Sequence, residues 1–225
     1  MRVAVVIPAY QAASSIRAVI ARTRAALPAA EIVVVDDGST DGTGDGGRGT
    51  GATLLTHPRN RGKGVSLRAG VAHACAHDAA VIVTLDADGQ HPPEEIPRLL
   101  RPIADGDADL VLGARQRDGV MPLSRRFTNW LSATLASRIG GQHVRDAQTG
   151  FRAFTRQLAM GVQAAGDRYE YEANFLLDAL RAGYRVVSVE VPTIYGRGAR
   201  SHFRAWGDTW RMARAFGRHA RRIVL

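Results

Sequence analysis

The chain has 225 residues, of which 45% are hydrophobic and 23% charged, the composition of an ordinary globular protein with room for one large α/β domain or two small ones. Its single cysteine, Cys75, excludes an internal disulfide framework and suits a reducing compartment. The apolar run after Met1 ends at Pro8, too early for a signal peptide, and no apolar segment approaches the roughly 20 residues that span a bilayer. We therefore expect a soluble or peripheral protein.

Strand-like apolar runs alternate with helical patterns along the chain, without an internal repeat. Apolar runs that read as strands cover residues 2–8, 31–37, 52–57, 80–86, 108–115 and 185–192. Helical patterns cover residues 14–27, 64–77, 93–103, 123–139, 155–162 and 170–182. This alternation predicts a mostly parallel sheet with helices on both faces. In such a sheet the ligand lies at the carboxyl ends of the strands.

Two connections have an unusual composition. Residues 42–51 include six glycines, and because glycine costs about 1 kcal/mol relative to alanine inside a helix, we expect a loop there. The segment HPRNRGKG, residues 57–64, leads into the second helix, with Asn60 as its expected N-cap.

Acidic pairs follow two of the predicted strands. Asp86 and Asp88 are alternate positions on an extended segment, so both carboxylates can face one site. Such a pair suits a hard divalent cation that bridges to a diphosphate, although an Asp-Gly turn in solvent is the plain alternative. Asp36 and Asp37 end a neighbouring strand, where a carboxylate can accept hydrogen bonds from a base or a ribose, or can form a turn.

A single lysine and a pair of histidines are candidates for ligand or metal binding. Lys63 is the only lysine among 30 basic residues, which suggests a compact positive charge near an anionic ligand, with chance as the alternative. His73 and His77 share a helical face, but Cys75 points elsewhere. With no third ligand nearby in the sequence, a zinc site is not expected there.

Eight segments, in order from Arg2 to about Phe203, resemble the family 2 nucleotide-sugar glycosyltransferases of GT-A fold, and within them the dolichyl- or polyprenyl-phosphate sugar synthases. The segments are VVIPAYQAASSI, IVVVDDGSTDGT, HPRNRGKGVSLRAG, VTLDADGQHPPEEIP, LVLGAR, RDAQTGFRAF, YEYEANFLLDALRAGYRVVSVEVP and SHF. The resemblance implies an α/β, Rossmann-like domain over residues 1–202, with a mixed, mainly parallel sheet. Residues 203–225 would form a basic C-terminal amphipathic helix.

The resemblance also implies roles for matching positions. The nucleotide pocket would be lined by Pro8, Ala9, Tyr10, Asp36 or Asp37, and Asp86, with Lys63 near the donor. Mg²⁺ or Mn²⁺ would be held against the donor diphosphate by Asp86, Asp88 and Gln90. The acceptor phosphate would lie near Arg115, Arg125 and Asn129, and Asp146 and Glu172 match acids beside the active site. Two departures leave the nucleotide open: Gln11-Ala12 replaces an Asn-Glu pair, and the glycine-rich segment replaces a helix.

The acceptor is either a phosphate or a hydroxyl. A phosphate monoester is already a nucleophilic anion at neutral pH and needs cations around it, which Arg115, Arg125, Arg126, Arg197 and Arg200 could supply. A hydroxyl needs a general base, and Asp146 is then the candidate.

The C-terminal segment is strongly basic. Residues 197–225 hold eight arginines and one acid and carry +7 of the net charge of +9, which predicts an anionic partner. From Phe203 onward, aromatic and arginine residues recur on adjoining helical faces, as in a helix at a membrane surface or in a last helix packed on its own domain.

Together these features predict an inverting, metal-dependent glycosyltransferase. Its donor would be a UDP- or GDP-sugar, and its acceptor a polyprenyl or dolichyl phosphate at the inner face of the cytoplasmic membrane, where an anionic surface would bind the basic tail. The alternatives are a hydroxyl acceptor, or a non-catalytic protein that binds anionic lipid or nucleic acid. We do not expect nucleic-acid binding, because only the tail offers a suitable surface.

Overall fold

The structure is a computed structural model that describes residues 1–115, 123–192 and 194, with the backbone alone described for 123–127. Its described part forms one sheet with strand order β3-β2-β1-β4-β6-β5-β7. The strands are β1 (Val3–Ala9), β2 (Glu31–Asp36), β3 (Thr53–Thr56), β4 (Val81–Thr84), β5 (Leu110–Arg115), β6 (Arg152–Thr155) and β7 (Val186–Val191). All pairings are parallel except those of β6, which runs antiparallel to both β4 and β5.

The helices connect these strands and cover the sheet. They are α1 (Ile16–Ala26), α2 (Thr43–Gly47), α3 (Lys63–Ala76), α4 (Ile96–Ala104), α5 (Leu123–Gly140), α6 (Arg156–Gly161) and α7 (Glu170–Arg181), with a 3-10 turn η1 (Pro93–Glu95) before α4. The six strands and six helices expected from the sequence are therefore present, with ends shifted by a few residues. The mainly parallel α/β sheet is confirmed.

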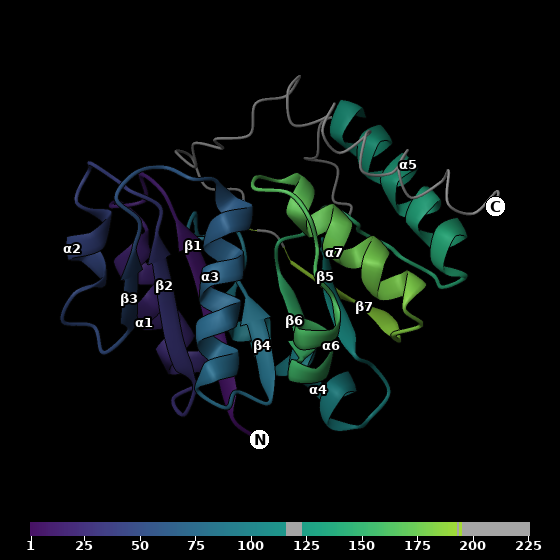
Figure 1. Ribbon diagram of the computed structural model, residues 1–225, viewed down its shortest axis with the longest axis horizontal. Coiled ribbons are helices and arrows are strands. Elements are labelled where there is room, and N and C mark those ends of the chain that lie inside the picture. Colours follow the sequence, from purple (N-terminus) through teal and green to yellow (C-terminus); the bar gives the residue numbers. More distant parts are fainter. Residues whose placement is uncertain (116–122, 193, 195–225) are drawn as a thin grey trace.

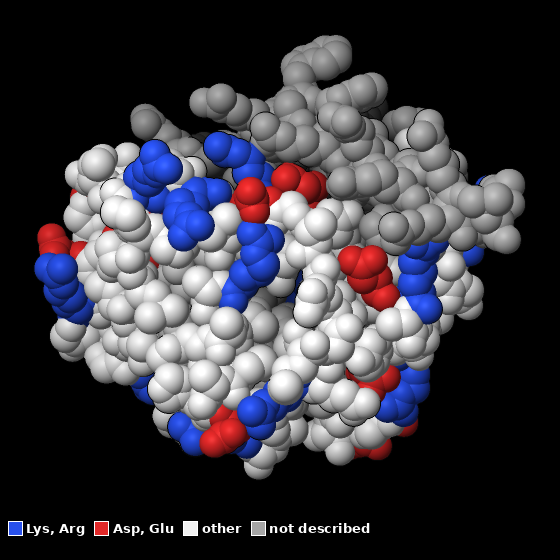
Figure 2. Space-filling model, viewed as in Figure 1, with Lys and Arg blue, Asp and Glu red and all other residues white. Residues whose placement is uncertain are grey.

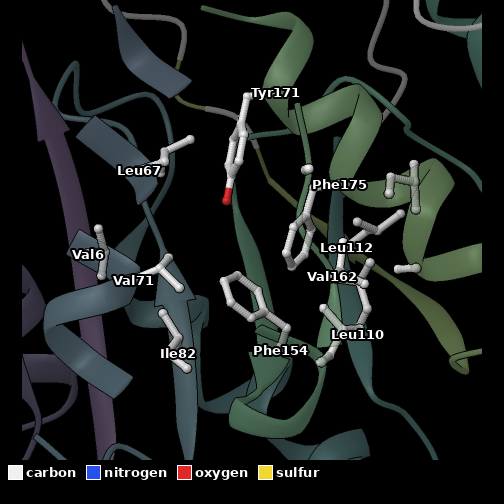
Figure 3. Close-up of a cluster of buried hydrophobic side chains, with 14 of the residues drawn as sticks. Val6, Leu67, Val71, Ile82, Leu110, Leu112, Phe154, Val162, Tyr171 and Phe175 are labelled. Atoms are coloured by element: carbon white, nitrogen blue, oxygen red, sulfur yellow. The ribbon is translucent and has the colours of Figure 1, made fainter. Parts of the chain in front are cut away.

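Alternate residues of the strands pack into two hydrophobic cores, one on each face of the sheet. On β1, Ala4 and Val6 face the core beneath α3, and Val5 and Ile7 face the core beneath α1. Figure 1 shows α3, α6 and α7 in front of the sheet and α1 behind it, while α4 packs on the α1 side. Figure 3 shows the front core, with labelled side chains from the strands, α3 and α7 pointing toward one another. Both faces of the sheet are thus covered, which leaves its edge at the strand ends for ligands.

The segment 42–51 was predicted as a loop, and this prediction was wrong over residues 43–47. Those residues form α2, whose Thr43 and Gly47 are buried. The Asp41 carboxylate accepts hydrogen bonds from the backbone N–H and the hydroxyl of Thr43. Packing and this side-chain contact outweigh the conformational cost of the glycines. The helix expected of the family after DGT is therefore present in a short form.

Asn60 is not the N-cap of α3. The helix starts at Lys63, and Gly62 is the N-cap with φ of +104°, a conformation that favours glycine. In the first turn of α3, the backbone N–H groups of Gly64 and Val65 donate to the backbone oxygen of Asp167, so no side-chain cap is needed.

The sequence reading missed β6. This strand has four residues and contains the buried Arg152, so it gave no apolar run. Because β6 is antiparallel to its neighbours, its first residue pairs with Thr84 and Leu112 near the carboxyl ends of β4 and β5. The segment that precedes β6, residues 146–151, is thereby brought to the same sheet edge as Asp86.

In the part of the chain that the structure describes, no helix combines the length and apolar character needed to cross a bilayer. The predicted amphipathic helix 203–225 and the boundary at residue 202 lie outside the described residues, as do Arg197 and Arg200.

Candidate active site

The ends of β1 and β2 form one side of the candidate site. Pro8 and Ala9 are buried in the last positions of β1, and Tyr10 beyond them is 37% exposed. Ala9 pairs with Asp36 across the strands, and Asp36 Oδ1 accepts a hydrogen bond from the Ser39 N–H at 3.0 Å. The structure therefore brings these predicted nucleotide-pocket residues together at the carboxyl edge of the sheet.

Asp37 has a different surrounding from the one expected. Its Oδ1 lies 2.8 Å from His57 Nδ1 and accepts the Arg61 N–H at 2.9 Å, while its Oδ2 accepts the Gly62 N–H at 2.8 Å. Both oxygens thus hold the 57–62 loop, and Asp37 is 3% exposed. In this structure Asp37 positions the loop that leads to Lys63. Asp36, whose side chain accepts a single backbone N–H among the described residues, is the acid of the pair that is better able to accept hydrogen bonds from a ligand.

Lys63 lies between two acids from different parts of the chain. Its Nζ is 2.6 Å from Asp86 Oδ1 and 3.1 Å from Glu172 Oε1. The Lys63 side chain comes from the first turn of α3, Asp86 follows β4, and Glu172 lies in the first turn of α7. Figure 2, in the orientation of Figure 1, shows acidic and basic side chains gathered along the upper margin, where the carboxyl ends of the strands and the start of α3 lie.

The pKa shifts of these residues reflect burial together with the charges that lie close to one another. Burial opposes ionisation of Asp86, but the Lys63 ammonium holds the pKa of Asp86 below its ordinary value. The pKa of Asp88 is raised by burial and by the charge of Asp86. The pKa of Glu172 is raised by burial, against the opposing effect of Lys63. Burial would lower the pKa of Lys63, yet Asp86 and Glu172 raise it, so the amine stays protonated.

These residues fit a divalent cation in charge and in donor type. Asp86, Asp88 and Glu172 provide three carboxylates, against the Lys63 ammonium and the buried Arg152 guanidinium, which interacts with Glu172 and Asp86. A net charge of −1 therefore remains when all are ionised. Carboxylate oxygens are the ligands that Mg²⁺ and Mn²⁺ prefer. Asp88 Oδ1 accepts the backbone N–H of Gln90 at 2.9 Å, which orients the carboxylate beside Asp86.

Gly150 makes room for this cluster. A Cβ atom on Gly150 would lie 2.8 Å from Asp86 Oδ2 and 2.9 Å from Glu172 Oε1, closer than real contacts allow. We expect Gly150→Ala to displace these carboxylates and to weaken metal-dependent donor binding at least about tenfold. Calorimetric titration of a nucleotide-sugar with Mn²⁺ measures this. Gly47→Ala, whose Cβ would meet its nearest atom at 3.5 Å, is the control, and equal affinity in both variants would contradict the prediction.

Arg115, the last residue of β5, forms a bidentate ion pair with Asp146. Arg115 Nε donates to Asp146 Oδ2 at 2.8 Å, and Nη2 donates to Oδ1 at 3.2 Å. Asp146 is 1% exposed and also accepts the Gln148 N–H at 3.0 Å. Burial would raise the pKa of Asp146, but Arg115 holds it below its ordinary value. This carboxylate is therefore a poor general base, and its contacts orient Arg115.

The low pKa of Asp146 predicts a dependence of stability on pH. Because its folded-state pKa lies below the ordinary 3.8, the unfolded chain takes up the proton first on acidification. The stabilisation is complete above the unfolded-state pKa and is lost as pH falls through the folded-state pKa. Chemical denaturation from pH 6 to 2 should show the difference in unfolding free energy between wild type and Asp146→Asn narrowing below about pH 4. A difference that stays constant over this pH range would contradict the prediction.

The predicted acceptor residues of α5 are placed only in part. Arg125 and Arg126 lie in the first turn of the helix, and their side chains are outside the described residues. Asn129 is buried, and among the described residues its Oδ1 has no hydrogen-bond partner. The structure thus brings Arg115 and Asp146 together and leaves the contacts of Arg125 undescribed.

Two site residues were not singled out from the sequence. His91 is 6% exposed, its ring stacks on Phe151 with centroids 5.4 Å apart, and burial lowers its pKa against the charges of Asp86 and Asp88. Gly150 approaches Asp86 only because of the antiparallel β6. His91 could have been found from the sequence, because it lies in QHPP, three residues after Asp88. No local pattern indicated that Gly150 lies near the acids.

The comparisons with known proteins agree with this arrangement. The family model for glycosyl transferase family 2 matches residues 4–162, well over half of the chain. The chain belongs to glycosyl transferase family 2. The family and the GT-A fold expected from the sequence are both confirmed, and the protein is an enzyme of the glycosyltransferase class.

Relatives of this family 2 glycosyltransferase include lipid-phosphate enzymes. It is 32% identical over 203 residues to the undecaprenyl-phosphate mannosyltransferase of Micrococcus luteus, which covers 85% of this chain and 83% of that protein. It is 29% identical over 206 residues to the polyprenol monophosphomannose synthase of Mycolicibacterium smegmatis, covering 84% and 76%.

Solved structures share the fold of this glycosyltransferase. Glucosyl-3-phosphoglycerate synthase of Mycobacterium tuberculosis, crystallised with Mn²⁺, uridine diphosphate and glucosyl-3-phosphoglycerate, superposes with a TM-score of 0.77. The match covers 97% of this chain and 79% of that one at 23% identity.

Proposed function

We propose that this family 2 glycosyltransferase moves a sugar from a UDP- or GDP-linked donor to a polyprenyl or dolichyl phosphate, with inversion and with a divalent metal. The donor part of this proposal rests on one observation, the cluster of charged side chains at the carboxyl edge of the sheet that comprises Asp86, Asp88, Glu172 and Lys63. Relatives named for transfer to lipid phosphates, and a structural neighbour holding Mn²⁺ and uridine diphosphate, support the proposal.

On the donor side, Asp86 and Asp88, with Gln90 beside them, would hold Mg²⁺ or Mn²⁺. When bound, such a cation supplies Lewis-acid stabilisation of the charge that builds on the departing nucleoside diphosphate. Pro8, Ala9, Tyr10 and Asp36 would line the nucleoside pocket. Asp37 would fix the 57–62 loop that carries the chain to Lys63, and Lys63 would keep its positive charge beside the phosphates.

On the acceptor side, the contacts favour a phosphate over a hydroxyl. Asp146, the candidate base, is paired with Arg115, which holds its pKa below the ordinary value, so this acid is not available as a strong base. A phosphate oxygen needs no base, because it is an anion at neutral pH. Arg115, held by Asp146, would orient that anion, and Arg125 would contribute a second guanidinium.

The same proposal places the enzyme at a membrane. A polyprenyl chain stays in the bilayer, so the enzyme has to approach the lipid surface to reach the phosphate. The arginines of residues 197–225 would bind anionic lipid at the inner face of the cytoplasmic membrane.

The first experiment titrates UDP-sugars and GDP-sugars by calorimetry, with and without Mn²⁺, against wild type and Asp88→Asn. Metal-dependent binding that is lost in the variant supports the donor site and identifies the nucleotide. Absence of binding to either class would contradict the donor assignment.

A second experiment compares polyprenyl phosphate with the matching polyprenol as acceptor. Transfer to the phosphate alone is expected. Transfer to the polyprenol that Asp146→Asn abolishes, while donor binding survives, would instead support the hydroxyl acceptor with Asp146 as its base.

A further inference from the structure

Glu31, His73 and His77 meet at the sheet edge opposite the candidate active site. Glu31 is the first residue of β2, His73 lies in the last turn of α3, and His77 follows that helix as its C-cap. One possible ligand atom from each residue lies within 4.8 Å of the other two. Figure 1 shows the end of α3 and the start of β2 at the lower edge, away from the start of α3. The fold supplies the third ligand that the sequence reading did not find.

The ring nitrogens of the two histidines are set up for ligation. His77 Nδ1 lies 2.9 Å from the backbone oxygen of His73, an acceptor that requires the proton on Nδ1 and so leaves the Nε2 lone pair free. His73 Nε2 lies 3.0 Å from Glu31 Oε1. The two rings stack with centroids 4.0 Å apart, as expected for residues four apart on a helix.

Glu31 carries the second observation. Its Oε2 is buried and, among the described residues, has no hydrogen-bond partner. A His73–Glu31 hydrogen bond alone satisfies Oε1 and leaves Oε2 without the partner that a buried carboxylate oxygen requires. A cation bound by the carboxylate would supply that partner.

We propose that Glu31, His73 and His77 form a Zn²⁺ site, separate from the carboxylate cluster at Asp86. Two imidazoles and one carboxylate are a donor set that Zn²⁺ takes, whereas Mg²⁺ requires oxygen ligands. His77 is exposed and the other two side chains are about one-fifth exposed, so the site is open to solvent and a water can complete the coordination. Zn²⁺ there fastens the end of α3 to β2, and α3 is the helix that begins with Lys63.

The test titrates Zn²⁺ alone into the full chain, in competition with a chromophoric chelator, and repeats the titration on His77→Ala and Glu31→Gln. Removing a residue that only hydrogen-bonds to a metal ligand typically lowers metal affinity by about 10–100-fold. Removing a ligand itself is therefore expected to weaken Zn²⁺ binding by at least about tenfold. His143→Ala, which removes an exposed histidine elsewhere, should bind Zn²⁺ as wild type does. All titrations are repeated in the Asp88→Asn background, which weakens Zn²⁺ binding at the carboxylate cluster.

Thermal melting gives an independent readout on the same proteins. In the Asp88→Asn background, Zn²⁺ should raise the Tm of the protein that keeps His77, but not that of the double variant with His77→Ala. Because His77 is exposed, its replacement leaves the core intact. Equal Zn²⁺ affinity with and without His77→Ala or Glu31→Gln in the Asp88→Asn background would overturn the proposal.

Discussion

Replacing Asp88 by asparagine is expected to lower kcat/KM for sugar transfer by roughly 100- to 1000-fold, because a Lewis acid contributes several kcal/mol of transition-state stabilisation and each 1.36 kcal/mol is a factor of ten. The variant keeps the shape of the side chain and its acceptor oxygen for the Gln90 N–H, but loses the charge. Initial rates at several Mn²⁺ concentrations measure the effect. The rate should recover in part at high Mn²⁺, since metal affinity is what the change removes.

Asp45→Asn is the matched control for this prediction. Asp45 is an exposed acid whose ion pair with Arg48 lies entirely at the surface, where such pairs contribute little. Its transfer rate should stay within about twofold of wild type. A rate for Asp88→Asn close to that of Asp45→Asn would contradict the metal role.

Replacing Lys63 by methionine is expected to destabilise the fold by about 3 kcal/mol, the low end for breaking a buried ion pair. The side chains of Lys63, Asp86 and Glu172 are 17%, 25% and 10% exposed, so the two carboxylates would be left without their cation in a mostly buried site. For a chain of this size the Tm should fall by about 6–12 °C. Mn²⁺ should then raise the Tm of Lys63→Met more than that of wild type, because the metal replaces the missing charge.

A second variant separates charge from packing. Removing one of the two carboxylates relieves the imbalance, so Lys63→Met with Glu172→Gln should be less destabilised than the sum of the single changes. Arg98→Met is the control, since Arg98 pairs with Glu95 at the surface and is 58% exposed. Strict additivity in the double variant, with no added effect of Mn²⁺, would show that Lys63 acts through packing alone.

Much of the architecture follows from local patterns. Buried parallel strands read as continuous apolar runs, as in VAVVIPA of β1 and EIVVVD of β2, and this predicted the sheet and the edge that carries the site. The pair Asp86 and Asp88 was found because acids directly after a buried strand require a partner. Lys63 was expected near the anionic donor, and this role stays a prediction; its 2.6 Å contact with Asp86 was not expected from the sequence.

What could not be predicted depends on contacts between distant segments. Asp36 and Asp37 are adjacent in the sequence, which does not tell them apart. Only the folded position of the 57–62 loop lets the Asp37 carboxylate accept hydrogen bonds from the backbone N–H groups of that loop. The glycines of residues 43–47 disfavour a helix locally, but the burial of Thr43 stabilises α2 there. Glu31 is 42 residues from His73, so no helical spacing could have indicated their contact.

The antiparallel β6 divides the sheet into two blocks. β1 to β4 form one block and β5 with β7 the other, and each joins β6 rather than its counterpart. β5 precedes β6 in the chain and β7 follows it, so the second block is assembled from segments on both sides of β6. A chimera that exchanges the whole block and keeps β6 therefore replaces two separate segments, one that begins before Leu110 and one that begins after Thr155, and it also replaces Glu172 of the carboxylate cluster.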